Sequence, residues 1–345
     1  MSIAEARDEW SPAGIFLNTA SYGLPPRVGF DALQAALTEW REGRGSWEHW
    51  SESTDGARSA FAAMVGVEAE RVAVGATVSE FVGLAAASLP ASARVLVADV
   101  EFTSTLFPFL VQQQARGLTV TTVAPSQLAE AIDARTDVVA FSAVQMSTGE
   151  VADLDAIAAA AAHHGALTLL DATQACGWLP IDAARFDAVV AAGYKWLMAP
   201  RGTAFMAVGD AWLERIVPHS AGWYAGEDVH SSYFGPPLRL ACSARRLDTS
   251  PAWFSWVGAQ PALELLNRIG IETVHQHDVA LANRLRTGLG MRPSNSAIVS
   301  AEVPDSADRL GRAGIAAAQR GGRLRVSCHL YNSVDDVDAT LDALA

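Results

Sequence analysis

The chain has 345 residues, of which 50% are apolar and 18% are charged, which argues against a disordered chain and leaves enough length for two lobes. Its net charge of −13 provides no basic stripe for phosphates, which argues against a nucleic-acid partner. No apolar run is long enough to span a membrane, and the charged N-terminus shows no signal-peptide core. Three widely spaced cysteines, Cys176, Cys242 and Cys328, indicate reduced thiols without a metal site, so we expect a cytoplasmic protein.

In chain order, a turn-rich segment over 17–26 precedes a helical pattern from Val28 to about Arg41. Glycines and tryptophans over 43–50 predict a flexible loop, which either lies on the surface or lines the mouth of a pocket. From Arg71 onward, apolar strands alternate with helices, which predicts a mostly parallel sheet whose ligands bind at the carboxyl ends of its strands. The expected strands are 71–74, 94–98, 118–123, 137–141, 166–170, 186–191 and 203–208, with helices such as 103–116 and 154–164 between them.

A second compositional unit begins near Pro251. We expect a large domain over 18–250 and a small α+β domain over 251–345, with residues 1–17 packing near the small domain. The expected elements of the small domain are helices 259–269 and 274–289, strand 296–303, helix 306–312, strand 322–329 and helix 334–344.

Lys195 is the only lysine among 25 basic residues, the others being arginines. A lysine amine can lose its proton and attack a carbonyl, whereas a guanidinium cannot. Alternatively, Lys195 has no chemical role and is present by chance in a composition in which arginine carries the positive charge. Lys195 follows the buried strand 186–191 in a loop marked by Gly193, Pro200 and Gly202, and this position favours a Schiff-base lysine.

Other residues at strand ends suit the same chemistry. Asp171 follows strand 166–170, where a carboxylate can keep a pyridine nitrogen protonated or, alternatively, cap a helix. Gln174 lies three residues on and can meet the phenolic oxygen of such a ring. Gly75-Ala76-Thr77 ends the first strand at the start of a helix, which is either a phosphate cradle or a simple cap. Phe102 is placed to stack on a planar ring, although most phenylalanines pack in a core.

These motifs, in this order, resemble those of one enzyme family. Asp171-Ala172-Thr173-Gln174, Gly193-Tyr194-Lys195-Trp196-Leu197 and Pro200-Arg201-Gly202-Thr203 resemble the class V branch of the fold-type-I pyridoxal-phosphate enzymes. Cysteine desulfurases, isopenicillin N epimerase and kynureninase belong to this branch. The resemblance extends from 17–18 to the segment 323–332. It implies an α/β fold with a seven-stranded, mostly parallel sheet, a pyridoxal 5′-phosphate cofactor, an amino-acid substrate, and a homodimer with the active site at the subunit interface.

The resemblance also implies roles for individual residues. Lys195 would form the Schiff base, Asp171 would pair with the pyridinium nitrogen, and Thr249 would reach the phosphate bound by the partner subunit. The complete set comprises catalytic Lys195, cofactor-binding Ala76, Thr77, Phe102, Asp171, Gln174, Tyr194 and Thr249, and substrate-binding Arg325 and Asn18.

The chain departs from the family pattern at two places. Many relatives have Ser or Thr and His where this chain has Ala192 and Tyr194, so its phosphate is held differently. In 312–318, alanine stands where cysteine desulfurases carry their nucleophilic cysteine, and Cys328 is expected to be an inert buried thiol. The missing cysteine and the inert Cys328 disfavour persulfide-forming desulfuration.

We therefore expect a pyridoxal-phosphate enzyme, with a lyase that cleaves a side chain, such as a C–S lyase, favoured over the other reaction types. The alternatives are an aminotransferase, an epimerase like isopenicillin N epimerase, and a non-catalytic binding protein that has kept the fold. A nucleotide-binding protein using Gly75-Ala76-Thr77 is disfavoured because the chain has no glycine-rich dinucleotide motif and no P-loop.

Overall fold

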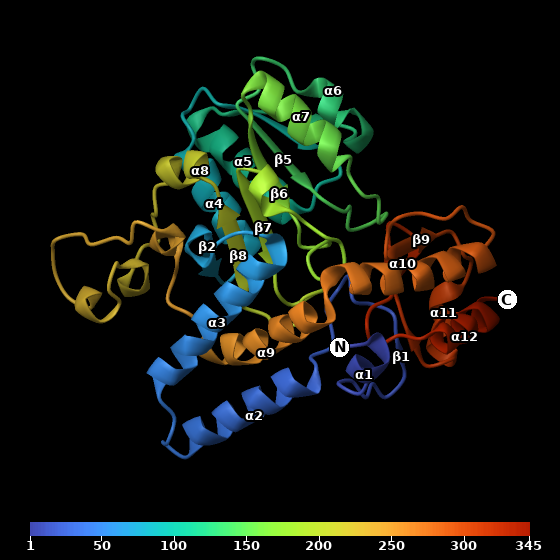
Figure 1. The fold of residues 1–345 in the computed structure, drawn as a ribbon. Coiled ribbons are helices and arrows are strands. Elements are labelled where there is room, and N and C mark those ends of the chain that lie inside the picture. The colour runs from blue at the N-terminus through green and yellow to red at the C-terminus, as the bar shows by residue number, and fades with distance from the viewer.

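The computed structural model describes residues 1–345, and seven strands form its central sheet in the order β2-β8-β7-β6-β5-β3-β4 (Figure 1). Only β8 runs antiparallel to its neighbours. This arrangement confirms the predicted α/β fold with a mostly parallel seven-stranded sheet, and each strand lies within two residues of its predicted bounds. The strands are β2 (Val72–Gly75), β3 (Arg94–Ala98), β4 (Thr119–Val123), β5 (Val138–Ser142), β6 (Leu167–Asp171), β7 (Ala188–Ala192) and β8 (Ala204–Val208).

Helices cover both faces of the sheet because successive strand residues point to opposite sides. On one face, residues such as Leu170 and Phe205 pack with helices α3, α6, α7 and α9. On the other face, residues such as Val190 and Met206 pack with α4, α5 and α8. The helices are α3 (Trp47–Val65), α4 (Val78–Ser88), α5 (Thr103–Arg116), α6 (Leu128–Ala131), α7 (Leu154–His164), α8 (Asp210–Arg215) and α9 (Trp253–Ile269).

The predicted loop over 43–50 is wrong from residue 47 onward, because α3 begins there. The Ser46 hydroxyl accepts a hydrogen bond from the backbone of His49 and caps this helix, a signal that the nearby glycines obscured. Trp50 is buried, and its ring centroid lies 5.0 Å from that of Phe254 on α9. The tryptophan therefore anchors α3 to α9 and does not line the mouth of a pocket.

The C-terminal part forms a second, smaller unit with its own core, to which Leu281, Val326 and Val337 contribute. Its antiparallel sheet has the order β11-β12-β9 and is packed by three helices. Two short strands, β10 and β11, were not predicted from the sequence. The elements are α10 (Ile271–Gly288), β9 (Ile298–Ala301), α11 (Ser306–Arg312), β10 (Ile315–Ala316), β11 (Ala318–Arg320), β12 (Arg323–Ser327) and α12 (Val334–Leu344).

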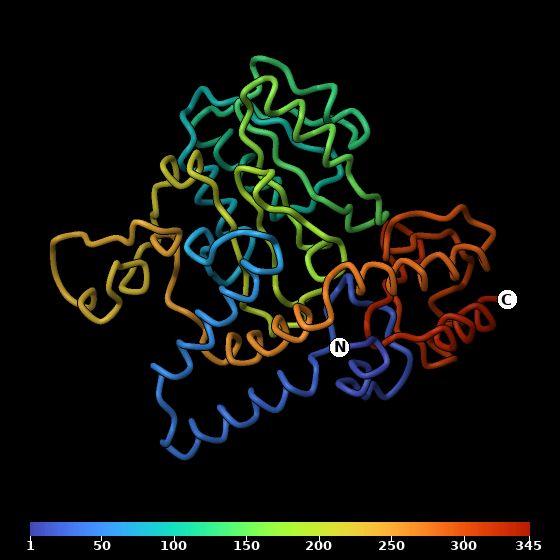
Figure 2. Tube along the Cα trace, viewed as in Figure 1, coloured from blue at the N-terminus to red at the C-terminus, as the bar shows by residue number.

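The N-terminal segment lies against this smaller unit, as the blue and red ends of the tube show (Figure 2). After α1 (Ile3–Arg7), strand β1 (Ile15–Phe16) pairs in parallel with β10, and the chain then leads to α2 (Arg27–Arg41). The domain boundary at residue 251 stays a prediction. Helix α9, which follows it, packs mainly on α2 and α3. None of the helices combines the length and apolar character needed to cross a lipid bilayer.

Candidate active site

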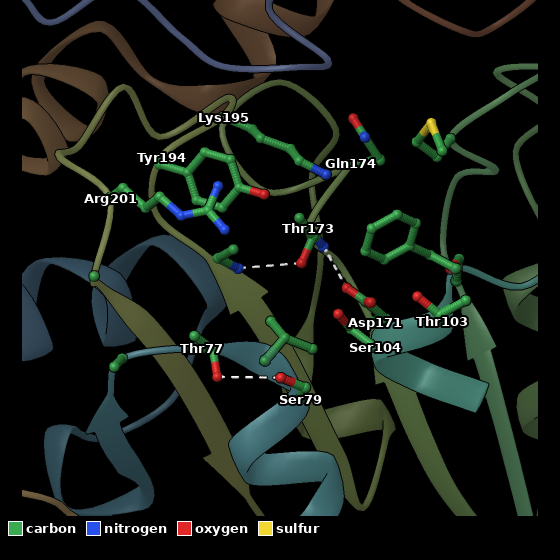
Figure 3. A pocket seen from close by; sticks show the side chains of 17 residues that line it. Thr77, Ser79, Thr103, Ser104, Asp171, Thr173, Gln174, Tyr194, Lys195 and Arg201 are labelled. Atoms are coloured by element: carbon green, nitrogen blue, oxygen red, sulfur yellow. Dashed lines mark hydrogen bonds between the residues drawn. The ribbon is translucent and has the colours of Figure 1, made fainter. Parts of the chain in front are cut away.

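A cavity of about 320 Å³ lies at the carboxyl ends of the parallel strands β2, β5, β6 and β7 (Figure 3). Parallel strands end at the same sheet edge, so residues far apart in sequence meet there. The cavity brings together seven of the ten predicted site residues: Ala76, Thr77, Phe102, Asp171, Gln174, Tyr194 and Lys195. Its other lining residues are Val78, Ser79, Thr103, Ser104, Ser142, Met146, Thr173, Ala192, Arg201 and Gly202.

The Lys195 amine projects into this cavity without a protein partner (Figure 3). The residue is 6% exposed, and its Nζ atom lies 5.4 Å from the centroid of the Phe102 ring and 5.7 Å from that of Tyr194. Burial, opposed by Asp171 and aided by the nearby Arg325 and Arg201, lowers the pKa of Lys195 to about 8. A buried lysine whose amine readily loses its proton is suited to nucleophilic attack on a carbonyl.

The loop that carries Lys195 is held tightly between two parts of the chain. Strand β7 ends at Ala192, and the backbone of Gly193 donates to the Thr203 carbonyl at 2.9 Å. On the other side, the backbone of Gly23 donates to the Tyr194 carbonyl at 2.9 Å. A Cβ atom at Gly23 would lie 2.1 Å from the Lys195 carbonyl oxygen. The absence of a side chain at Gly23 therefore allows the N-terminal segment to approach the lysine.

Asp171 ends β6, and no helix starts there, so it is not a helix cap. Its Oδ2 atom accepts from the Thr105 hydroxyl at 2.8 Å, and its Oδ1 atom accepts from the Thr173 backbone at 2.9 Å. The carboxylate is 5% exposed and has no cationic partner within ion-pairing distance. These two hydrogen bonds orient a carboxylate that retains acceptor capacity toward the cavity.

Gln174 is more constrained than the sequence indicated. Its Oε1 atom accepts from the Trp196 indole at 2.8 Å, and its Nε2 atom donates to the Ala20 carbonyl at 3.0 Å. One amide N–H of Gln174 remains for a ligand. The first hydrogen bond ties the end of β6 to the lysine loop, and the second ties it to the N-terminal segment.

The opposite end of the cavity combines a helix N-terminus with one cation. Thr77 caps α4, its hydroxyl accepting from the Glu80 backbone at 3.3 Å. Free backbone N–H groups in the first turn of a helix favour an anion. Arg201 lines the same cavity as the first turn of α4, with its guanidinium carbon 4.9 Å from the centroid of the Tyr194 ring. Sequence reasoning missed Arg201 as a site residue, although the resemblance motif contained it.

Phe102 lies on the rim of the cavity and is 42% exposed, so it is not a core residue. It immediately precedes α5, and its ring centroid lies 5.4 Å from the lysine amine. An exposed aromatic face at this position is available to a planar ligand.

Three predicted residues do not line the cavity, namely Arg325, Asn18 and Thr249. Arg325 reaches its edge, because its Nη1 atom donates to the carbonyl of the lining residue Met146 at 2.9 Å. The Oδ1 atom of Asn18 is buried without a hydrogen-bond partner. Thr249 is half-buried next to Asp248, and its contact with a partner subunit stays a prediction.

His329 and Asp278 form a buried pair that sequence reasoning also missed. The His329 ring lies between two oxygen atoms, with Nδ1 2.8 Å from Asp278 Oδ2 and Nε2 3.0 Å from the Trp196 carbonyl. Both side chains are fully buried. The pair connects the smaller unit directly to the residue after Lys195, and the only signal in the sequence was the histidine of the C-terminal motif.

Comparison with known proteins identifies the family. A family model described as class-V aminotransferase matches residues 40–310. The chain belongs to the class-V aminotransferase family. It is 28% identical to an uncharacterized aminotransferase of Bacillus subtilis, over 92% of this chain and 88% of the relative. It is 30% identical to isopenicillin N epimerase of Amycolatopsis lactamdurans, over 52% of this chain and 50% of the relative.

A solved structure shares the fold over nearly the whole chain. The cystine C–S lyase in complex with its product, cysteine persulfide, superposes with a TM-score of 0.87 and 20% identity, covering 96% of this chain and 97% of the lyase. This likeness confirms the predicted fold-type-I architecture. Family membership makes the protein a pyridoxal-phosphate-dependent enzyme.

The residues present fit this cofactor. The cavity offers an amine for the aldehyde, a carboxylate for a ring nitrogen, an exposed aromatic face, and a helix N-terminus with an arginine for a phosphate. Each of these groups complements a different part of pyridoxal phosphate. The buried amine without a partner is the clearest sign, because a structural lysine at this depth would be paired.

Proposed function

We propose that the protein converts an α-amino acid or amino-acid derivative, with Lys195 as its catalytic residue. The observation that carries this proposal is the buried, unpaired amine of Lys195 facing Asp171 across one cavity. When bound, pyridoxal phosphate draws electrons away from the substrate α-carbon. Lys195 holds the cofactor and, once released, takes the α-proton at Nζ, a role that its lowered pKa favours.

The remaining residues hold and orient the reacting groups. We assign Asp171 to the protonated ring nitrogen, Gln174 to the phenolic oxygen and Phe102 to one ring face. Ala76, Thr77 and Tyr194 belong to the phosphate end, which Thr249 would complete from a partner subunit. Arg325 binds the α-carboxylate, since its guanidinium can form two parallel hydrogen bonds, and Asn18 lies beside the substrate.

For the reaction, we favour elimination from the side chain, such as C–S cleavage that releases a thiol. None of the three cysteines lines the cavity. Burial raises the pKa of Cys176 to about 12 and also raises the pKa of Cys328, which keeps both thiols protonated. A sulfur-accepting cysteine is therefore missing, whereas elimination needs none. The shared fold of the cystine C–S lyase supports this preference.

Transamination is the second candidate. It is supported by the relative from Bacillus subtilis, which is named an aminotransferase and matches almost the full length of this chain. The two reactions begin with the same removal of the α-proton by Lys195 and differ in where the next proton or leaving group goes.

Product analysis separates these reactions. The holoenzyme is incubated with a panel of α-amino acids and cysteine S-conjugates in deuterium oxide, with Lys195→Ala as control. Elimination from an S-conjugate yields a thiol, pyruvate and ammonia in equal amounts. A 2-oxo acid with the carbon skeleton retained, formed with the aminated cofactor, identifies transamination, and deuterium at an inverted α-carbon identifies epimerisation. No turnover and no α-deuteration with any member would refute the proposal.

We also propose a homodimer in which the partner completes the active site. The segment between α8 and α9 projects away from the main body (Figure 1). It carries Phe234 and Leu238, which are 87% and 81% exposed. Exposed apolar side chains on one projecting segment are typical of an interface. Light scattering should give twice the 36.4 kDa mass of the chain, whereas a monomer at micromolar concentration would refute the dimer.

A further inference from the structure

Three arginines near Lys195 have no acidic partner. Arg201, Arg320 and Arg325 all lower the pKa of Lys195, after the larger effect of burial. None of them takes part in an ion pair of the protein. Arg323, on the same small sheet, pairs with Glu302. In a chain with 38 acidic side chains, three unpaired cations at one site indicate that ligands supply the anions.

Arg320 and Arg325 converge on a single atom. In the antiparallel register of β11 and β12, Arg320 lies opposite Arg323, which shares its face with Arg325. The Ser21 hydroxyl accepts from Nη2 of Arg325 at 2.7 Å and from Nη2 of Arg320 at 3.2 Å. Two guanidinium groups thus meet within hydrogen-bonding distance of one neutral oxygen. Such close approach of like charges is unfavourable unless anions bind there.

Arg325 is the arginine whose charge the protein itself leaves most clearly unpaired. The residue is 1% exposed, and its Nε atom is buried without a hydrogen-bond partner. Burial and, to a smaller extent, the nearby Arg320 together lower the pKa of Arg325 to about 10. Arg320 is half-buried, and its other hydrogen bond goes to the neighbouring Gln319 carbonyl at 2.7 Å. Neither cation is neutralised by the protein.

A simple amino acid and the cofactor bring two anionic groups that an arginine can bind, the α-carboxylate and the phosphate. The site has three unpaired arginines, one more than these two groups require. Arg201 lies at the α4 end of the cavity, where it suits the phosphate. Arg325 suits the α-carboxylate, and Arg320 remains. We infer, on the basis of the proposed function, that the substrate is an α-amino acid with a second carboxylate, and that Arg320 binds this group. Because both arginines reach the same hydroxyl, the two carboxylates must lie close together, as in a compact diacid.

Isosteric amino-acid pairs test this inference. The holoenzyme is titrated with aspartate and asparagine, and with glutamate and glutamine, and the change in the cofactor absorbance gives each dissociation constant. We expect the diacids to bind on the order of 10- to 100-fold more tightly than their amides. Arg320→Gln should abolish this preference and leave the binding of the amides within about twofold. Arg323→Gln, on the same face but paired with Glu302, should keep the preference.

Two results would overturn the inference while leaving the proposed function intact. One is equal binding of acid and amide by the wild-type protein. The other is an equal loss for both members of each pair in Arg320→Gln, which would assign Arg320 to the α-carboxylate together with Arg325. Thermal melts and cofactor content establish that each variant is folded and loaded. If no amino acid changes the absorbance of the wild-type holoenzyme, the proposed function itself fails.

Discussion

Removal of the Asp171 charge is the substitution that best separates a catalytic from a structural carboxylate. Asp171→Asn keeps the size of the side chain and an oxygen that can accept from the Thr173 backbone. It removes the negative charge that we assign to the ring nitrogen. Loss of one well-placed charge of this kind typically lowers the rate on the order of 10²-fold or more. We expect that loss in kcat/KM, with pyridoxal phosphate still bound.

The stability effect can be worked out separately. Asp171→Ala removes the acceptors of two buried hydrogen bonds, from Thr105 at 2.8 Å and Thr173 at 2.9 Å. At about 1 kcal/mol per hydrogen bond, this variant should lose about 2 kcal/mol of folding free energy. Asp171→Asn should lose about 1 kcal/mol or less. If Asp171 is only structural, Asp171→Ala should be less stable than Asp171→Asn, and both variants should keep the wild-type rate. If Asp171 is catalytic, both variants should lose rate.

Glu101→Gln provides the matched control. Glu101 is another buried carboxylate near a strand end, and it accepts from the Ser142 backbone and Gln145 at 2.9 Å, but it does not line the cavity. Burial raises the pKa of Glu101, and its amide variant keeps the size of the side chain and an oxygen acceptor. Steady-state rates, cofactor content by absorbance, and thermal melts are measured for all variants. A rate for Asp171→Asn within about threefold of wild type would refute the assigned role.

Three further predictions concern single residues. The rate at which the cofactor-free protein takes up pyridoxal phosphate should rise with pH, with a midpoint near 8. The neutral amine is the form that reacts, and burial lowers the pKa of Lys195 to about 8. A midpoint near 10.5, the ordinary pKa of lysine, would contradict this prediction. Arg325→Lys should raise KM for α-amino acids by about 10-fold or more while amines lacking a carboxylate are little affected, and unchanged amino-acid kinetics would show that the carboxylate binds elsewhere. Asp248→Ala should lower the free energy of unfolding by about 3 kcal/mol, because Asp248 accepts from buried Arg58 at 2.6 Å and from the Val74 backbone at 2.8 Å. Denaturant unfolding measures this loss, and wild-type stability would contradict the importance of the pair.

The strand order and the strand-end residues were predictable because they depend on local patterns. Apolar runs mark buried parallel strands, and parallel strands end at one edge, so Asp171 and Lys195 were expected to meet. The sole lysine needed no structural information to be recognised. These patterns sufficed for the fold and for most residues of the cavity.

What the sequence did not reveal depends on contacts between distant segments. Arg320 was not singled out because its strand, β11, has only three residues and its link to Ser21 spans about 300 positions in the chain. The hydrogen bonds of Gln174 to Trp196 and Ala20 likewise arise only when the N-terminal segment folds over the lysine loop. Helix α3 was not predicted, and at its start the glycines next to Ser46 suggested a loop. Spacing along the chain does not report such tertiary partners.

Chemical reduction of the holoenzyme tests the central claim most directly. Borohydride fixes a cofactor bound to an amine, and trypsin then leaves the labelled lysine uncut, so Lys195 should be found in a modified peptide spanning 186–201. The Lys195→Ala protein should remain unlabelled under the same conditions. The account predicts one label per chain, on Lys195. A label on the N-terminal amine alone, or no label in a protein that still binds pyridoxal phosphate, would contradict it.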